Sequence, residues 1–310
     1  MCSVSSTDQD VTAPQTEDVA ASLCKKGYNL LWHDDFVSSA SLDNWNYMLY
    51  NGCEYGICGW GNNELEWYTN STKNVRVKNG NLKIIGRRAS DAERKKCCNG
   101  DCKERECEFT SGRIRTFNKF AVNPSYNKGR EEIRIDARIK MPAGEGPWPS
   151  FTMLPEDSPK TCSGCGFYGD WPSSGAITVS QKLNKQANYS GGILYGGPPP
   201  NVLASTFEKN LGKDIEGYHT YSLVWTPKRM IWKLDGKNVH KAKSSGGRDT
   251  PGWFTETRTD NKNAPFDKPF YLMLSLALGG DQTGASYQKV KETLKSPQTM
   301  DVEYIRVCAK

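Results

Sequence analysis

The sequence predicts an all-β protein built as a sandwich of antiparallel sheets. Short runs rich in β-branched or aromatic residues recur along the chain and are bounded by Gly, Pro or Asn-Gly turns. The best helical period is the short segment 286–294. Strands without crossover helices favour an antiparallel sandwich over an α/β fold. The 310 residues, 36% of them hydrophobic and 11% aromatic, are sufficient to bury a large core.

The chain divides into a polar tail and one long β-rich region. Residues 1–23 are dominated by Ser, Thr, Asp and Gln and do not alternate, so we expect a disordered N-terminal tail. Residues 24–310 contain no internal repeat and no linker, and we expect a single domain. Within it, Asn79-Gly80 between two alternating runs of 74–88 predicts a hairpin. The other clear strand signals are 131–141, 219–239, 269–278 and 300–308.

The charge pattern argues against a nucleic-acid partner. The formal net charge is +6, and the densest basic runs, 87–88 and 94–96, flank a cysteine cluster instead of lining a helix. No apolar run has the length of a membrane helix, so we expect no membrane span. Residues 1–22 lack the hydrophobic stretch of a signal peptide, and we expect a trimmed mature form of a secreted protein.

Eleven cysteines predict disulfides in an oxidising compartment. Zinc bound by the cluster at 97–107 is the weaker alternative, because no histidine lies in or near it. A bond from Cys24 to Cys308 would tie neighbouring terminal strands, and Cys2 is the odd cysteine. Sequons at Asn70 and Asn188 also fit secretion. The disulfide candidates are Cys24, Cys53, Cys58, Cys97, Cys98, Cys102, Cys107, Cys162, Cys165 and Cys308.

An ordered series of blocks covers 28–307: LLWHDDF, GWGNNELEWYTN, NVRVKNGNLKI, FTSGRIRT, GREEIRIDARIKMPAGEGPWPSFTML, WPSSGAI, HTYSLVWTPKRMIWKLDGK, PFDKPFYLMLSLALGG and QTMDVEYIRV. This series resembles the laminarinase-like branch of glycoside hydrolase family 16, which includes the β-1,3-glucan recognition proteins of invertebrate immunity. The resemblance implies a jelly-roll sandwich of two curved antiparallel sheets, of the concanavalin A type. A sugar-binding cleft would cross the concave face.

The family's hydrolysis needs two carboxylates about 5 Å apart, one as nucleophile and one as acid/base. They stand on one strand in a motif of the form W-P-x-x-G-E-I-D-I-M-E, with an aspartate between them. One bulged residue is needed to bring both onto the same face. Here WPSSG at 171–175 matches the lead-in, but Ala176, Thr178 and Gln181 occupy the three carboxylate positions.

The apolar positions of the same strand are retained as Ile177 and Val179. Alanine cannot attack an anomeric carbon, and a neutral amide has no proton of useful acidity to give the leaving oxygen. The resemblance therefore predicts a pseudoenzyme of an endo-β-1,3-glucanase-like family, with no catalytic residues.

Polar and aromatic residues in the matching blocks predict contacts to a sugar. Pyranose rings stack on aromatic faces, and their hydroxyls bond amides and carboxylates. Part of the family's platform is absent, because Thr152, Leu194 and Pro199 replace a tryptophan, a histidine and an aromatic residue. Core packing is the alternative for every tryptophan: it is favoured for Trp32, Trp225 and Trp232, and as probable as a cleft position for Trp60 and Trp148. The carbohydrate-binding candidates are Trp60, Asn62, Asn63, Glu64, Trp148 and Trp171.

Three functions remain open from the sequence. The first is an inactive relative that binds β-1,3-glucan or another extracellular polysaccharide. The second is a secreted structural or matrix protein whose positive surface contacts an anionic polymer. The third is a glucan hydrolase with relocated carboxylates, for which the candidates are Glu145, Glu156, Asp157 and Asp170, although loop carboxylates are mostly solvated surface charges. We expect no cofactor, except that Asp34 or Asp301 would be the ligand of a structural calcium ion.

Overall fold

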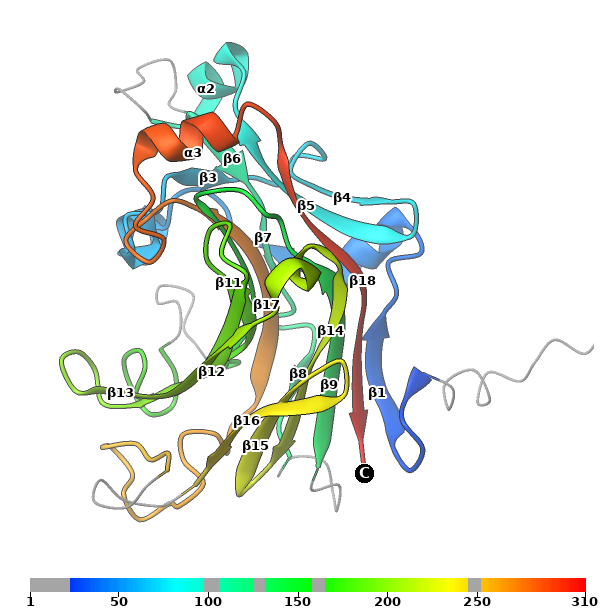
Figure 1. Ribbon diagram of the computed structural model, residues 1–310. Helices are drawn as coiled ribbons and strands as arrows, with labels where there is room; N and C mark the ends of the chain where they lie inside the picture. The colour runs from blue at the N-terminus through cyan, green and yellow to red at the C-terminus, as the bar shows by residue number, and fades with distance from the viewer. Residues whose placement is uncertain (1–22, 98–105, 125–131, 158–164, 245–251) are drawn as a thin grey trace, which may run out of the picture.

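Two large β-sheets packed face to face form most of the structure. The computed structural model describes residues 23–97, 106–124, 132–157, 165–244 and 252–310. In Figure 1 the sheet with β11, β12 and β17 curves on the left, and the sheet with β9, β14 and β18 lies to its right. The all-β sandwich of antiparallel sheets predicted from the sequence is confirmed. The predicted tail lies outside the described residues except for Leu23.

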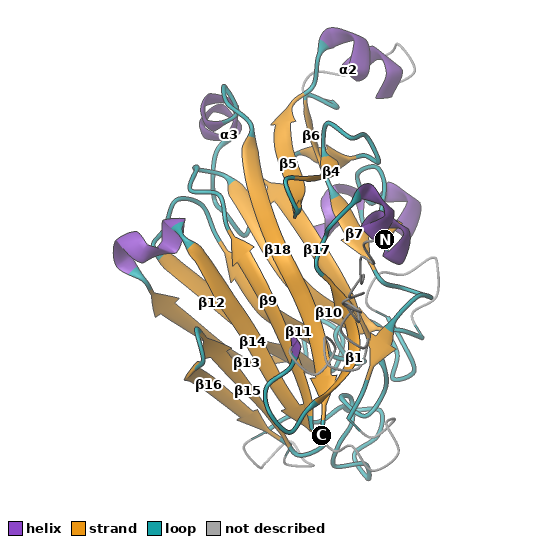
Figure 2. Ribbon diagram, turned by 90° about the vertical axis from the view of Figure 1, so that its right-hand side faces the viewer, coloured by secondary structure: helices purple, strands orange, loops and turns teal. Residues whose placement is uncertain are grey.

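The outer sheet has ten strands, and Figure 2 shows its outward face. Its order is β16-β15-β14-β9-β18-β5-β6-β3, with β1 paired to β18 and β4 paired to β5. All its pairs are antiparallel except β3 with β6. The bounds are β1 Asn29–Asp34, β3 Glu66–Tyr68, β4 Val75–Lys78, β5 Asn81–Arg88, β6 Phe109–Ser111, β9 Ile133–Lys140, β14 Tyr218–Thr226, β15 Arg229–Leu234, β16 Lys237–Lys243 and β18 Gln298–Ala309.

The inner sheet has eight strands in the order β13-β12-β11-β10-β17-β7-β2, with β8 paired to β17. We call its face that points away from the other sheet the concave face. The bounds are β2 Asn46–Tyr47, β7 Arg113–Arg115, β8 Ala121–Val122, β10 Pro147–Pro155, β11 Ala176–Lys182, β12 Asn188–Gly196, β13 Val202–Asn210 and β17 Phe270–Leu278.

Local sequence signals account for the hairpin and the C-terminal helix. Asn79 and Gly80 both have positive φ, at 55° and 70°, and join β4 to β5 as an Asn-Gly hairpin turn should. Helix α3 lies within the predicted segment 286–294, and the Ser286 hydroxyl accepts from the Lys289 N–H at its start. The helices are α2 Asp91–Cys97 and α3 Tyr287–Thr293, with 3₁₀ turns η1 Ser39–Asn44, η2 Cys53–Tyr55, η3 Cys58–Gly61 and η4 Gly212–Glu216.

The core lies between the two sheets. Trp225 and Trp232 are 0% and 1% exposed within it, as the alternating pattern predicted, and Trp32 packs partly buried at its margin. Strand β17 is buried over all nine residues. Phe270, Leu272, Leu274 and Leu276 enter the main core, whereas Tyr271 and Met273 enter a second cluster on the concave face. Leu278 belongs to a third, smaller cluster with Val290.

Disulfides join several of the predicted cysteines. Cys24 is bonded to Cys308, the pair expected from the sequence, and Cys53 is bonded to Cys58. Cys97 is bonded to Cys107, so these two are not zinc ligands. Cys165 is also disulfide-bonded. The candidates Cys98, Cys102 and Cys162 lie outside the described residues, as does Cys2.

The Cys24–Cys308 bond should contribute more stability than the Cys53–Cys58 bond. It closes a loop of 284 residues, against 5 for the other, and loop-closure entropy removed from the unfolded chain grows with loop length. We expect Cys24→Ala/Cys308→Ala to lower the free energy of unfolding by about 2–5 kcal/mol. Denaturant unfolding without reductant measures it, with Cys53→Ala/Cys58→Ala as the control. Equal losses from both variants would contradict the entropic explanation.

Candidate functional site on the concave face

Strand β11 keeps one buried face and one partly exposed face. Ile177 and Val179 are 0% and 1% exposed in the main core. Ala176, Thr178 and Gln181 are partly exposed. The register to β12 places Ala176 opposite Leu194 and Gln181 opposite Ser190, so five steps along β11 face four along β12. This one-residue difference is the predicted bulge, which puts both positions on the concave face.

The opposite sheet supports the backbone at the bulge. The carbonyl oxygen of Thr178 accepts a hydrogen bond of 2.9 Å from the indole Nε1 of Trp232, which stands on β15. Because Trp232 is 1% exposed, this bond is protected from competing water. The course of β11 therefore depends on the core and on the second sheet, and needs no contribution from its concave side chains.

A row of neutral hydrogen-bonding groups crosses the concave face at Gln181. Its Oε1 accepts a bond of 3.0 Å from Nε1 of Trp148, which stands on β10. The neighbour of Gln181 on β10 is Ser150, whose hydroxyl bonds that of Ser275 on β17 at 2.8 Å. Ser150 and Ser275 are only 6% and 2% exposed, so Gln181 is the member of this row whose amide is open to the hydroxyl groups of a ligand.

A second row crosses the concave face at Thr178. Thr152 on β10 lies opposite Thr178, and Met273 and then Arg115 follow on the next two strands. The hydroxyl of Thr152, which stands where the family's tryptophan was expected, is buried without a hydrogen-bond partner. A short side chain thus lies next to Thr178 on the concave face.

The relocated-carboxylate candidates lie at two opposite ends of β10. Glu145 precedes the strand and pairs with Lys185 at 3.6 Å. Glu156 follows the strand, accepts from the N–H of Asn118 at 2.6 Å, and burial raises its pKa. Nine strand residues separate the two, about 30 Å of extended chain, so Glu145 and Glu156 do not form a catalytic pair. Asp157 adjoins Glu156, and Asp170 lies in the loop before β11.

Part of the concave face is covered by an apolar cluster. Tyr271, Met273 and Leu154 point to this face and are 0%, 7% and 8% exposed. Trp60 and Phe117 pack against them. Trp60, a predicted sugar-contacting residue, is itself only 5% exposed. The concave face over β7 and β17 is therefore packed by side chains, and its partly exposed positions lie mainly on β10–β12.

Beside this cluster, Glu64 is held in a buried network with Trp60 and Asn62. The Asn62 amide donates to Oε1 of Glu64 at 3.1 Å, and Arg113 lies 3.6 Å from Oε2. The Arg113 guanidinium also stacks 4.2 Å above the Trp60 ring. The three predicted residues thus come together, but as a packed network. Sequence reasoning missed Arg113, whose signal was its alternation with buried Ile114 in SGRIR.

Glu66 is the second carboxylate of this network and was also missed. It is 2% exposed, and Oε2 accepts from the N–H of Leu278 at 2.7 Å. Burial, followed by the neighbouring charge of Glu64, raises the pKa of Glu66 well above its usual range. The spacing Glu-Leu-Glu at 64–66 could have indicated two carboxylates on one face of an extended segment.

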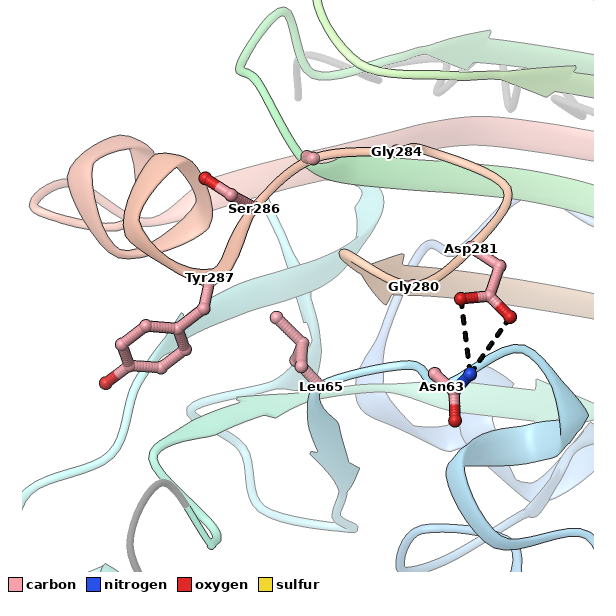
Figure 3. A pocket seen from close by; sticks show the side chains of 8 residues that line it. Asn63, Leu65, Gly280, Asp281, Gly284, Ser286 and Tyr287 are labelled. Carbon is pink, nitrogen blue, oxygen red and sulfur yellow. Dashed lines mark hydrogen bonds between the residues drawn. The ribbon is translucent and has the colours of Figure 1, made fainter.

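The other candidates lie elsewhere. Asn63 turns outward and donates to both carboxylate oxygens of Asp281, at 3.0 and 3.2 Å. As Figure 3 shows, this pair lines a shallow hollow of about 400 Å³ between the Asn63 loop and the start of α3. Trp148 stands at the Gln181 end of β11, whereas Trp171, 38% exposed, precedes its Ala176 end. The remaining lining residues of the hollow are Leu65, Gly280, Gly284, Ala285, Ser286 and Tyr287.

The two aspartates named for calcium are hydrogen-bonded to donors within the chain. Both carboxylate oxygens of Asp34 accept N–H bonds, from Phe36 at 3.0 Å and Trp45 at 3.0 Å. Asp301 accepts from Asn81 and Lys83. Calcium binding by either aspartate stays a prediction. Across the described ranges, no group of three His, Cys, Asp or Glu side chains is arranged to hold an ion.

None of the helices in the described ranges has the length and apolarity to span a membrane.

The raised pKa of Glu66 predicts a pH-dependent stability. Between the unfolded pKa of about 4.3 and the higher folded pKa, the native state keeps a proton that the unfolded chain has lost. Stability must therefore fall as pH rises through this window. Glu66→Gln keeps an acceptor for the Leu278 N–H and should make this fall in stability, above the unfolded pKa of about 4.3, smaller.

Denaturant unfolding at several pH values tests this prediction. Glu292→Gln serves as the control because Glu292 is an exposed carboxylate on α3. An unchanged pH slope in Glu66→Gln would contradict the assignment of the titration to Glu66.

Comparison with known proteins places the chain among glucan-active and glucan-binding proteins. It is 34% identical over 289 residues to a glucan endo-1,3-beta-glucosidase A1 of Niallia circulans, covering 91% of this chain and 38% of that protein. It is 32% identical over 187 residues to a beta-1,3-glucan-binding protein of Penaeus monodon, covering 55% of this chain and 47% of that protein. The chain thus spans less than half the length of both relatives.

The solved structures agree in fold. The endo-beta-1,3-glucanase of Pyrococcus furiosus superposes with a TM-score of 0.68 and 28% identity, over 91% of this chain and 94% of that one. This likeness supports the jelly-roll arrangement expected for the two sheets. The sequence model of glycosyl hydrolases family 16 matches residues 62–295. On this match, together with the shared fold, the chain belongs to glycosyl hydrolase family 16.

Proposed function

We propose that this chain is a non-hydrolytic member of its family that binds β-1,3-glucan or another extracellular polysaccharide on the concave face. The observation that carries the proposal is the neutral concave side of β11. Ala176, Thr178 and Gln181 occupy that side, and the bulge expected for the catalytic motif lies between Thr178 and Gln181. Retaining hydrolysis needs two carboxylates about 5 Å apart across the glycosidic bond. Neither of the corresponding positions carries an acid.

Binding is supported by the groups that remain around β11. Gln181 offers a partly exposed amide for sugar hydroxyls, and Trp148 fixes this amide through its indole N–H. Trp148 is partly exposed and Trp171 is 38% exposed, so each has ring surface available for a pyranose face. The similarity to the beta-1,3-glucan-binding protein of Penaeus monodon favours β-1,3-glucan among neutral polysaccharides.

An extracellular location is part of the proposal. Three disulfides join described cysteines, and this chemistry persists in oxidising compartments. Of the two sequons, Asn70 lies exposed after β3 and offers room for a glycan. Asn188 lies within β12, where its amide donates to Glu208.

A structural or matrix role is the second candidate. The observation that favours it is the apolar packing of Trp60 and Phe117 over Tyr271 and Met273, which covers part of the concave face. A protein that used the sandwich as a building block would not need this face to be open.

Hydrolysis should be undetectable in the natural sequence. A reducing-sugar assay on laminarin and lichenan measures it. Ala176→Glu/Thr178→Asp/Gln181→Glu restores the three acids on a strand whose bulge is held by Trp232, so we expect weak hydrolysis to appear. The matched control is Thr178→Asp/Gln181→Glu, which keeps the natural Ala176 in place of the nucleophile and should stay inactive. Turnover by the natural sequence would refute the proposal.

Glucan retention should depend on the two tryptophans beside β11. In a pull-down on insoluble β-1,3-glucan, we expect Trp148→Ala and Trp171→Ala each to weaken retention about fivefold, the effect of losing an aromatic contact worth on the order of 1 kcal/mol. Tyr304→Ala, on the outer sheet, is the control and should bind normally. Absence of retention on every polysaccharide tested would exclude the binding function and favour the structural role.

A further inference from the structure

The outward face of β15 and β16 carries a row of basic side chains. Met230, Trp232 and Ala242 are buried on the inner side of these two strands. Their alternate neighbours project outward on the sheet face seen in Figure 2, where β14, β15 and β16 run side by side. Lys25 follows the Cys24 disulfide beside them. We call the following five residues the basic strip: Lys25, Arg229, Lys233, Lys241 and Lys243.

Like charges lie close together within the basic strip. The β15–β16 register sets Arg229 directly opposite Lys243, and Lys241 follows two residues along the same edge. Like charges in directly opposite positions destabilise a sheet. Burial, with the nearby charges of Arg134 and Lys25, lowers the pKa of Lys233. The fold thus holds cations together at a cost in stability.

Little of this charge is neutralised within the chain. Arg229 lies 3.7 Å from Glu132, but Glu132 is shared with Lys310 at 3.0 Å and with the hydroxyl of Tyr28. Arg134 is neutralised by Asp136 at 2.6 Å. In the part of the chain that the structure describes, no carboxylate forms an ion pair with Lys25, Lys241 or Lys243. The Lys233 ammonium donates to Asn238 and lies within the electrostatic reach of Asp136 and Glu132.

We propose that the basic strip binds a sulfated or carboxylated polysaccharide, at a site separate from the concave face. Adjacent strands stand about 4.8 Å apart and alternate residues about 6.7 Å apart along a strand, so the strip presents cations at regular intervals. A polymer with repeated anionic groups can contact several of them at once. Such contacts relieve the repulsion between the lysines and release counterions from the polymer.

The chemistry of the strip and of the chain favours a glycan over a nucleic acid. Single-stranded nucleic acids are held by aromatic side chains that stack on bases, and none of the five residues is aromatic. The disulfides indicate an oxidising compartment, where anionic polysaccharides are the ordinary polyanions. The two sites also differ in chemistry: a neutral amide is available at Gln181, whereas the strip offers the exposed ammonium groups of Lys25, Lys241 and Lys243.

Binding of the full chain to dextran sulfate tests the proposal, with neutral dextran as the reference polymer. We expect dextran sulfate to bind in low salt and to be released as salt rises, and neutral dextran not to bind. Lys241→Gln/Lys243→Gln should weaken binding roughly 25-fold, at about fivefold for each cation removed beside an anionic surface. The double variant should also lower the dependence of affinity on salt concentration.

Matched controls separate this site from net charge and from the concave face. Lys209→Gln/Lys289→Gln removes the same charge from two exposed lysines on β13 and α3, and should leave binding nearly unchanged. Trp148→Ala/Trp171→Ala should leave dextran sulfate binding intact, whatever its effect on glucan. Equal losses in the two lysine variants would overturn the proposal. So would a DNA duplex that binds as tightly as dextran sulfate and with the same sensitivity to the strip.

Discussion

Strand β17 connects the two packed regions on which the molecule depends. All nine residues from Phe270 to Leu278 are buried, because its two faces serve different clusters. Leu272, Leu274 and Leu276 fill the space between the sheets, while Tyr271 and Met273 anchor the apolar cover of the concave face. β17 also pairs with β10 along its whole length, which fixes the register of the neighbour that meets β11. A polar residue without a partner would disturb the core or the concave face, since neither side of this strand is solvated. Ser275 is accommodated because its hydroxyl bonds that of Ser150.

The two faces of β11 have different roles: the core face fixes where the strand lies, and the concave face carries the groups available to a ligand. Ile177 and Val179 place the strand in the core, and Trp232 holds the Thr178 carbonyl from the other sheet. The concave side chains contribute to neither. The neutral side chains of Ala176, Thr178 and Gln181 therefore do not determine where the strand lies, and Gln181 keeps the capacity to hydrogen-bond a ligand.

The sequence predicted those features that follow from local pattern. Alternation predicted the buried pair Ile177 and Val179, Asn79-Gly80 predicted the hairpin, and the motif spacing predicted the bulge before Gln181. The buried network of Glu66 and Arg113 was not predicted, because it depends on β3 and β7 meeting at a distance along the chain. The burial of Trp60 likewise follows from Tyr271 and Met273, some 210 residues away. The basic strip was not predicted, because its lysines are scattered in the sequence and come close together only through strand register.

The bond from Trp232 to the Thr178 carbonyl holds the backbone of β11 without using the side chains on its concave face. The indole that supports the bulge belongs to the core, so substitutions at Ala176, Thr178 and Gln181 change the chemistry of the concave face while this support remains. A main-chain superposition on a family member therefore reports the shared fold, and the chemistry has to be judged from the side chains at positions 176, 178 and 181.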